Sequence, residues 1–331
     1  MLRLNHNQKL LNRIDFNTPI SDLQALLEAK GWISHEQIKA TTKAGEGNMN
    51  MVMRVDTDQR SFILKQPRPF VFKYPDIPAP EDRILTEYQF HQVVSGSAVG
   101  AQVPRVLHFD PADYLLMSAF IEEANDMIYL YETGHPTSAQ FTSLINGLNE
   151  LHALSVEDYP PNQGLKALNH QHIFHLPFIE DNGFSLDTIQ PGLQAIAEPL
   201  KRDKALYTKV ENLGKSYLGQ GEVLLHGDYY PGSWMQTEEQ VYIIDAEFSH
   251  LGFREFDLGV MAGHLIMASQ EETYLDKVLG NYQHEKDEQL VSQIAGIEII
   301  RRLIGLAQLP MERTLEQKQA LLKLAKDLIL S

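Results

Sequence analysis

Residues 226–257 constrain the fold of this chain most, because they hold two acidic groups that each follow a short apolar run. The run 223–225 precedes a His-Gly-Asp triplet at 226–228, and the run 241–244 precedes Asp-Ala-Glu at 245–247. Short apolar runs rich in β-branched residues predict buried strands. We therefore expect both acidic groups at the mouth of one site.

The residue types at this mouth suit the transfer of a phosphoryl group. A Pro-Gly turn signal within 229–233 predicts that Asp228 lies in a loop, where a carboxylate can meet an incoming hydroxyl. Asp245 and Glu247, two apart on an extended segment, would project to the same side and suit a hard cation such as Mg²⁺. Phosphoryl transfer needs an oriented nucleophile and neutralised phosphate charge. The alternative is a set of solvated turn acids.

These residues resemble kinase-like small-molecule phosphotransferases, the family of aminoglycoside phosphotransferases, choline kinases and methylthioribose kinases. The triplet at 226–228 matches their His-Gly-Asp loop, and residues 245–259 look most like methylthioribose kinase. The resemblance implies Asp228 as catalytic base, with Asp245 and Glu247 on the metal. Most of the superfamily has a metal-holding Asn where this chain has Ser233, so the part played by that position is in doubt.

The resemblance also implies an α+β, two-lobed protein-kinase-like fold. Residues 1–122 would form a small N-lobe with an antiparallel sheet, and residues 123–331 a larger, mainly helical C-lobe. The N-lobe would bind the nucleotide, and the run 45–50 opens into a predicted strand at 51–55, as a glycine-rich phosphate loop does. A plain hairpin is the alternative. The candidate nucleotide contacts in this loop are Gly45, Gly47, Asn48 and Asn50.

Further nucleotide-binding candidates follow along the N-lobe. Lys65 ends an apolar strand at 61–66 and is the candidate for the phosphates, unless it marks the solvent end of an edge strand. In the kinase-like fold a helical Glu pairs with this Lys, which selects Glu87 on the predicted helix 84–94, with an ordinary exposed helix acid as the alternative. The strand 114–121 resembles the hinge, where Phe120 and Glu122 would meet the adenine edge.

An arginine pair near the carboxyl end concerns the substrate. Arg301 and Arg302 interrupt an apolar stripe formed by Ile294, Ile297, Ile300 and Ile304. Neighbouring helical residues lie about 100° apart, so one arginine can point inward while the other pairs elsewhere; the alternative is a pair of surface arginines. The run 298–307 resembles the end of methylthioribose kinases, in which an arginine doublet contributes to the substrate site.

Several helices are predicted for the C-lobe. Apolar residues at helical spacing predict a core helix at 138–154, with His152 as a packing histidine. The region 189–218 is predicted to be mostly helical, with Pro191 and Pro199 dividing it into two pieces. Asp257 is predicted to cap a buried helix at 256–268, and the resemblance implies that this residue steadies the catalytic loop.

Composition excludes several other classes. The chain has 331 residues, 43% of them hydrophobic, no cysteine and a formal net charge of −16. The negative charge argues against a nucleic-acid binder, while it permits a cationic substrate. No P-loop motif is visible, which argues against P-loop folds. No long apolar run or secretory core is visible and cysteine is absent, so we expect a protein of the cytoplasm without a membrane span. The resemblance implies a homodimer.

The sequence thus predicts an enzyme that uses ATP and Mg²⁺ to phosphorylate a hydroxyl group of a small molecule, most closely methylthioribose or a related sugar. An aminoglycoside or amino-alcohol phosphotransferase of the same fold is the nearer alternative. A nucleotide-binding pseudokinase-like module is the alternative of another class, supported by Ser233. The chain is shorter than a typical methylthioribose kinase, with the shortfall in the second lobe.

Overall fold

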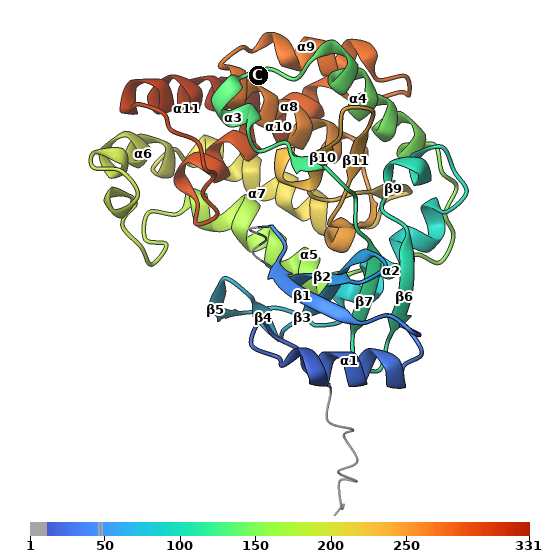
Figure 1. The fold of residues 1–331 in the computed structure, drawn as a ribbon. Helices are drawn as coiled ribbons and strands as arrows, with labels where there is room; N and C mark the ends of the chain where they lie inside the picture. The colour runs from blue at the N-terminus through green and yellow to red at the C-terminus, as the bar shows by residue number, and fades with distance from the viewer. Residues whose placement is uncertain (1–11, 46, 48) are drawn as a thin grey trace, which may run out of the picture. The chain divides into compact units, whose positions relative to one another are not determined.

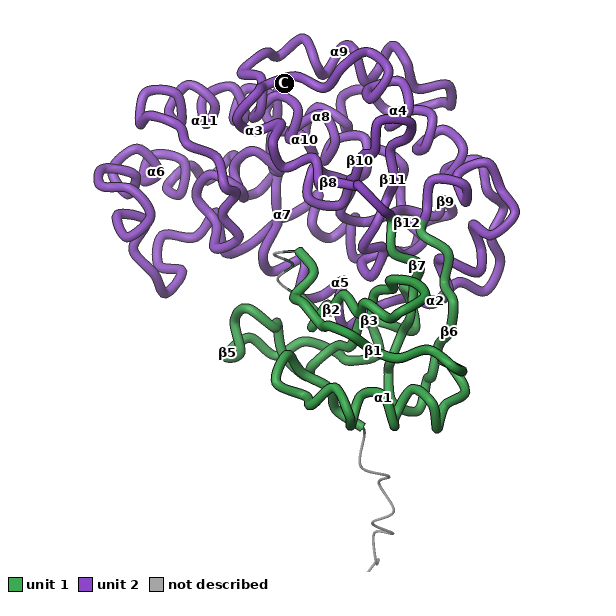
Figure 2. Tube along the Cα trace, viewed as in Figure 1, with its two compact units in different colours: residues 1–88, 104–121 green, residues 89–103, 122–331 purple. Residues whose placement is uncertain are grey.

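The chain forms two compact units in a computed structural model that describes residues 12–45, 47 and 49–331 (Figure 1). The first unit extends to residue 88 and includes 104–121, while the second comprises 89–103 and 122–331 (Figure 2). A small antiparallel sheet in the first unit and a mainly helical second unit confirm the predicted α+β, kinase-like fold class. The division after residue 122 into functional lobes stays a prediction.

The first unit is built on a five-stranded antiparallel sheet with the order β1-β2-β3-β7-β6. Its strands are β1 Ile38–Lys43, β2 Asn50–Thr57, β3 Ser61–Pro67, β6 Val106–Asp110 and β7 Leu115–Ala119. The other elements are α1 Ile20–Ala29, the hairpin β4 Phe70–Val71 and β5 Tyr74–Pro78, and the first turns of α2 Arg83–Val94. The strands predicted at 51–55, 61–66 and 114–121 are therefore confirmed.

The core of the first unit follows from the two-residue period of β2. Met51, Met53 and Val55 are buried in one cluster with Leu23 and Leu27 of α1. Side chains alternate between the two faces of a strand, so the same strand leaves its other residues for the opposite face of the sheet. One face thus forms the core under α1, and the other is left for polar residues.

The second unit is mainly helical, and its centre is the pair α8 and α10 (Figure 1). Every residue of α8 except the last is buried, including the polar residues Glu255, Asp257 and His264. Its helices are α3 Leu130–Thr133, α4 Ser138–His152, α5 Gln163–His170, α6 Leu193–Lys201, α7 Lys204–Leu218, α8 Glu255–Ser269, α9 Thr273–Asn281, α10 Glu288–Ile304 and α11 Leu315–Leu330. Among the residues that the structure describes, no helix has the length and apolarity needed to cross a membrane.

A glycine lets α8 and α10 approach each other closely. A Cβ added at Gly263 would lie 2.9 Å from the Ala295 carbonyl oxygen and 3.2 Å from Cβ of Glu298. The first distance is shorter than real Cβ atoms show, so only glycine fits here without a shift of the backbone. This close approach brings polar residues of α8 within hydrogen-bonding distance of α10.

Short strands of the second unit precede the loops that hold Asp228 and Asp245. β9 Val223–Leu225 pairs with β12 His250–Gly252, whereas β10 Trp234–Gln236 lies between β11 Val241–Ile243 and β8 Asn125–Asp126. Both predicted apolar runs are strands, and the loop that holds Asp228 leaves β9 as expected.

Two details of the predicted helices are wrong. Asp257 does not cap α8, because the helix begins at Glu255 and places Asp257 inside its first turn. The two helical pieces predicted in 189–218 are present as α6 and α7, but the division is not at the prolines: Pro191 precedes α6 and Pro199 lies inside it, while the break falls at Asp203, whose side chain caps α7. A cap such as Asp203 begins a new helix more decisively than a proline in the last turns ends one.

Candidate active site

Lys65 and Glu87 form a buried ion pair in the first unit. Nζ of Lys65 lies 2.9 Å from Oε1 and 2.8 Å from Oε2 of Glu87, and each side chain is about 5% exposed. Because β3 is an inner strand, the alternative that Lys65 marks the solvent end of an edge strand is wrong. Glu87 is likewise not an exposed helix acid. The pair fixes the direction of the lysine side chain.

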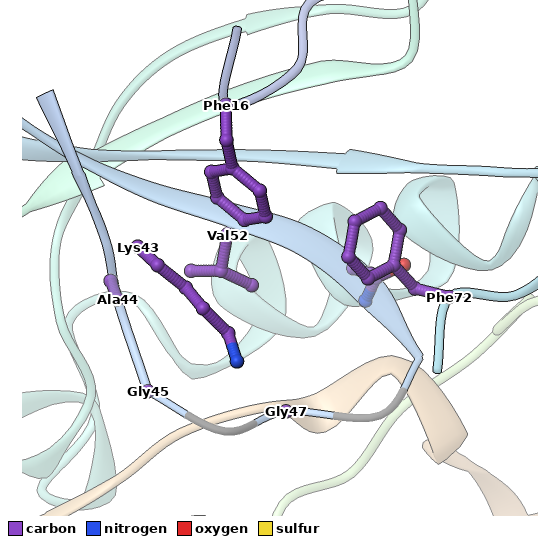
Figure 3. A pocket seen from close by; sticks show the side chains of 8 residues that line it. Phe16, Lys43, Ala44, Gly45, Gly47, Val52 and Phe72 are labelled. Atoms are coloured by element: carbon purple, nitrogen blue, oxygen red, sulfur yellow. The ribbon is translucent and has the colours of Figure 1, made fainter. Parts of the chain in front are cut away.

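The glycine-rich run borders a small hollow in the same unit (Figure 3). Gly45, Gly47 and Asn50 line it, while Asn48 lies outside the described residues. Phe16 and Phe72 also line it, and their rings meet edge to face with centroids 5.9 Å apart. Gly45 has a φ of +69°, a conformation that glycine adopts without strain. Nucleotide binding by these residues stays a prediction.

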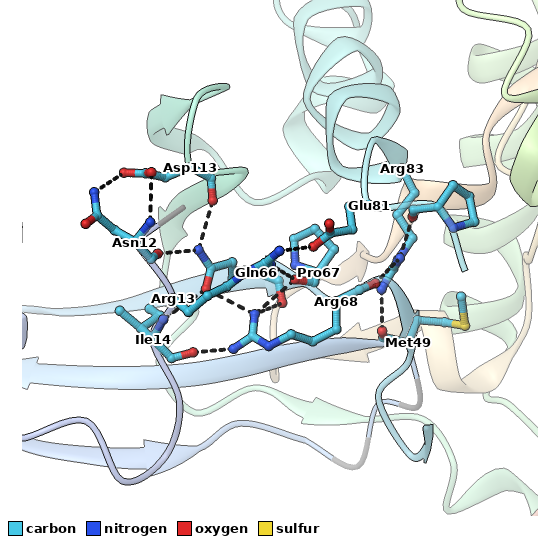
Figure 4. A network of polar contacts seen from close by, with 11 residues as sticks. Asn12, Arg13, Ile14, Met49, Gln66, Pro67, Arg68, Glu81, Arg83 and Asp113 are labelled. Atoms are coloured by element: carbon cyan, nitrogen blue, oxygen red, sulfur yellow. Dashed lines mark hydrogen bonds and ion pairs between the residues drawn. The ribbon is translucent and has the colours of Figure 1, made fainter. Parts of the chain in front are cut away.

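Arg83 fixes the carboxyl end of this run, a role that sequence reasoning missed. Its side chain is fully buried, Nε donates to Oδ1 of Asn50 at 2.9 Å, and Nη2 donates to the carbonyl of Met49 at 2.6 Å. Figure 4 shows this guanidinium in the polar network that continues to Arg68. A buried arginine is held by the acceptors it satisfies, so Arg83 locks the start of β2. Its position at the first residue of α2 gave no signal of this contact.

The two hinge candidates differ in their surroundings. Phe120 follows β7, and the guanidinium of Arg54 lies 4.0 Å from the centroid of its ring. Glu122 is exposed. Their proposed contacts with adenine stay predictions.

The side chain of Asp257 holds the His-Gly-Asp loop through two backbone N–H groups of that loop. Its Oδ2 accepts from the N–H of His226 at 2.7 Å, and its Oδ1 accepts from the N–H of Gly227 at 3.0 Å. Burial works to raise the pKa of Asp257, but the hydrogen bond from His152, the charges of His152 and His226 and the bond from the loop outweigh it and keep the pKa below its usual value. The implied role of Asp257 in steadying the loop agrees with this geometry, and His152 packs beside it.

Gly227 is required by the path of this loop. Its φ is +83°, and a Cβ built there would lie 2.3 Å from the carbonyl oxygen of Phe248. A side chain would meet both a strained conformation and rigid backbone.

Gly227→Ala should therefore lower the free energy of unfolding by about 1–3 kcal/mol, the usual cost of such strain, and should also lower turnover. Thermal denaturation and steady-state kinetics measure the two effects. The control is Gly280→Ala, since a Cβ at Gly280 meets no atom within 4 Å. Equal stability of the two variants would contradict the prediction.

Asp228 meets both arginines of the predicted pair. Nη2 of Arg301 lies 3.4 Å and Nη2 of Arg302 lies 3.3 Å from Oδ1 of Asp228. The expectations that only one arginine turns inward, or that both are at the surface, are wrong: each is 6% exposed. Burial raises the pKa of Asp228 above its usual 3.8, against the opposing charges of Arg302 and Arg301. The loop thus presents a carboxylate with two fixed cations.

The second acidic group adjoins this loop through His226, whose Nε2 donates to the carbonyl of Ile244 at 2.9 Å. The segment is not extended as predicted: Asp245 is left-handed, with φ +61° and ψ +47°, and a single 3₁₀ turn follows at 246–248. Consequently the argument that alternation puts Asp245 and Glu247 on one side does not hold. Aspartate tolerates this conformation better than most residues, which permits the sharp turn here.

Ser233 connects the two loops by its backbone. It is buried, its N–H donates to the carbonyl of Tyr230 at 2.8 Å, and its carbonyl accepts from the N–H of Ile244 at 2.9 Å. Within the described parts of the chain, no group of three or more His, Asp or Glu residues could hold a metal ion by itself. Mg²⁺ in nucleotide sites commonly takes one or two carboxylates and completes its shell with phosphates and water, so the carboxylates of Asp245 and Glu247 suit this ion by their chemistry. Their binding of Mg²⁺ stays a prediction.

Comparison with known proteins identifies the family of this chain. A model of the phosphotransferase enzyme family, APH, matches residues 41–290, which is more than half of the chain. The chain belongs to this family. The match includes Lys65, Asp228 and Asp245 but ends before Arg301 and Arg302.

Among individual relatives, methylthioribose kinase 1 of Oryza sativa subsp. japonica is 28% identical over 241 residues, which cover 68% of this chain and 55% of the rice protein. The chain thus spans about half the length of the rice relatives it matches. The methylthioribose kinase of Bacillus cereus (strain B4264) is 22% identical over 376 residues, covering 94% of this chain and 92% of the bacterial protein.

Solved structures of family members share the fold. A complex of the spectinomycin phosphotransferase APH(9)-Ia has a TM-score of 0.55 at 16% identity and covers 93% of this chain and 98% of its own. The choline kinase LicA from Streptococcus pneumoniae has a TM-score of 0.53 at 13% identity and covers 93% and 99%. At these identities the likeness concerns the phosphotransferase fold alone.

Proposed function

We propose that this phosphotransferase family member transfers the γ-phosphoryl group of ATP, with Mg²⁺, to a hydroxyl group of methylthioribose or a related sugar. The observation that carries the proposal is the placement of Arg301 and Arg302 at one carboxylate oxygen of Asp228. A hydroxyl brought to Asp228 would meet a proton acceptor beside two guanidinium donors.

Each residue has a role in this proposal. Asp228 orients the acceptor hydroxyl and accepts its proton as the oxygen attacks phosphorus. Arg301 and Arg302 hold neighbouring hydroxyl groups of the acceptor and keep Asp228 in place. Lys65, held by Glu87, takes phosphate oxygens of the nucleotide. Asp245 and Glu247 hold Mg²⁺, which when bound neutralises phosphate charge.

The arginine pair also bears on the class of acceptor. Because Arg301 and Arg302 are both paired with Asp228, this carboxylate is not free to pair with the positive charge of an aminoglycoside or a choline-type acceptor, so the pair disfavours cationic acceptors. A neutral sugar instead offers several hydroxyl oxygens that accept from arginine. The relatives named methylthioribose kinase support the same choice. The resemblance further supports a homodimer, and the absence of cysteine supports a place in the cytoplasm.

The test is ATP consumption by the purified protein with Mg²⁺ against methylthioribose, other pentoses, aminoglycosides and choline. We expect turnover with methylthioribose or another neutral sugar. Turnover with an aminoglycoside or choline alone would overturn the acceptor while keeping the mechanism. Nucleotide binding without turnover on any acceptor would favour the pseudokinase-like module.

A further inference from the structure

We infer that Glu298, backed by His264, is a positioning residue that aims both Arg301 and Arg302 at Asp228. This inference rests on the proposed function. It assigns to Glu298 a part in binding the acceptor, although Glu298 itself is buried and acts only through the two arginines. Glu298 is 1% exposed and lies on α10, three and four residues before the two arginines.

The hydrogen bonds of Glu298 explain the direction of both guanidinium groups. Its Oε2 accepts from Nε of Arg301, and its Oε1 accepts from Nε of Arg302 at 2.9 Å. With Nε of each arginine tied to the same carboxylate, Nη2 of each turns toward Asp228. A guanidinium is planar, so fixing one nitrogen and the plane of the group also fixes the other nitrogens. Neighbouring helical residues would otherwise point about 100° apart.

His264 of α8 fixes Glu298 in turn. Nε2 of His264 lies 2.7 Å from Oε1 of Glu298, and Nδ1 lies 2.5 Å from the hydroxyl of Tyr131. Burial lowers the pKa of His264 to about 4, so the ring is neutral at physiological pH. A carboxylate only accepts, so the single ring proton is on Nε2, and Nδ1 accepts from Tyr131.

The charges of this cluster balance. Glu298 and Asp228 are the acids, and Arg301 and Arg302 are the bases. Burial works against the ionised form of Glu298, but the two arginines and His264 hold its pKa well below the usual range. Without Glu298, two largely buried cations would face Asp228 alone, which is costly in a protein interior. Balanced charge suits an uncharged acceptor.

A second observation ties the cluster to the catalytic loop. The ring of Tyr230, two residues after Asp228, lies under the guanidinium carbon of Arg302 at 4.6 Å from its centroid and packs on His264 at a centroid distance of 4.8 Å. The aromatic face gives Arg302 a further contact that depends on its direction. The loop, α8 and α10 thus meet at the residues that Glu298 orients.

A purely structural role is the competing explanation, because i,i+3 and i,i+4 ion pairs also stabilise helices. The two explanations predict different properties for the variant Glu298→Gln. A glutamine has the same shape but one acceptor oxygen, so it cannot accept from three donors. If Glu298 acts through the arginines, the variant loses acceptor binding and not nucleotide binding, and its effect shrinks when an arginine is already absent.

The experiment compares the wild type with Glu298→Gln, Glu298→Asp, Arg302→Ala and the double variant Glu298→Gln/Arg302→Ala, using methylthioribose as acceptor. For Glu298→Gln we expect kcat/KM to fall about 10- to 100-fold, as for lost hydrogen bonds to charged groups, mainly through KM. The kcat/KM of Glu298→Asp should lie between those of the wild type and Glu298→Gln. Nucleotide affinity should stay within about twofold of the wild-type value in all variants. The double variant should lose less than the product of the two single losses, because only the part of the Glu298→Gln effect that acts through Arg301 remains. The control is Glu255→Gln, a buried glutamate of α8 that should change none of these values.

Losses that multiply in the double variant, or an unchanged acceptor KM in Glu298→Gln, would overturn the inference. A readout without turnover keeps it separate from the proposed function: the Nε–H proton signals of Arg301 and Arg302, assigned with Lys variants, should persist in the wild type and exchange rapidly in Glu298→Gln. Persistent signals in that variant would also overturn the inference. A wild type that consumes no ATP with any acceptor would overturn the proposed function, while these signals still decide the role of Glu298.

Discussion

Asp228→Asn should lower turnover by about 100- to 10,000-fold, the range expected for loss of a general base, with little change in nucleotide affinity. Asparagine keeps the shape of the side chain and an oxygen that can accept from Arg301 and Arg302. Alanine is a less clean replacement, because it would leave two buried guanidinium groups without this partner. The measurement is single-turnover kinetics with the best acceptor, together with calorimetric binding of the nucleotide.

Two comparisons make this result specific. Asp276→Asn, at an exposed position on α9, should leave turnover unchanged. In the wild type, the acid limb of kcat/KM against pH should lie above 3.8, since burial raises the pKa of Asp228 and activity is lost as pH falls through that pKa. Unchanged turnover in Asp228→Asn would remove this residue from the reaction.

The parts of the fold that the sequence predicts are those set by local pattern. Strands β2, β3, β9 and β11 follow from short apolar runs between turn residues, and the loop after β9 follows from the Pro-Gly turn signal within 229–233. The pairing of Lys65 with Glu87 came instead from the resemblance to kinases, because 22 residues of chain separate the two.

Directions of side chains were not predictable in the same way. The spacing along α10 suggests that Arg301 and Arg302 diverge, but it carries no information about the carboxylate that turns both the same way. A search for acids three and four residues before the pair finds Glu298, so i,i+4 spacing was the available signal. His264 is different: its contact depends on the close packing of α8 and α10 at Gly263, which sequence periodicity does not report.

The conformation of Asp245 was also missed, because alternation describes only regular strand and β11 ends at Ile243. Asp245 is the second residue after β11, and its left-handed conformation is uncommon for a residue other than glycine; such conformations cluster at functional sites. Asp245 follows Ile244, whose carbonyl accepts from His226, so the turn at Asp245 adjoins the His-Gly-Asp loop in the proposed metal site.

Asp245→Asn should therefore raise the Mg²⁺ concentration for half-maximal activity at least about 10-fold and lower turnover about 100-fold, as loss of a charged metal ligand would. Asparagine adopts the left-handed conformation as readily as aspartate, so the backbone at φ +61° is kept and only the charge is removed. The matched control is Asp158→Asn, an exposed aspartate with φ +54°, which should change neither value. Activity would be titrated with Mg²⁺ at fixed ATP, beside Glu247→Gln. If Asp245→Asn kept the wild-type Mg²⁺ dependence while Glu247→Gln needed more Mg²⁺, Glu247 would be the metal ligand and the turn at Asp245 would serve to position Glu247. If both variants kept the wild-type Mg²⁺ dependence, neither residue would hold the metal.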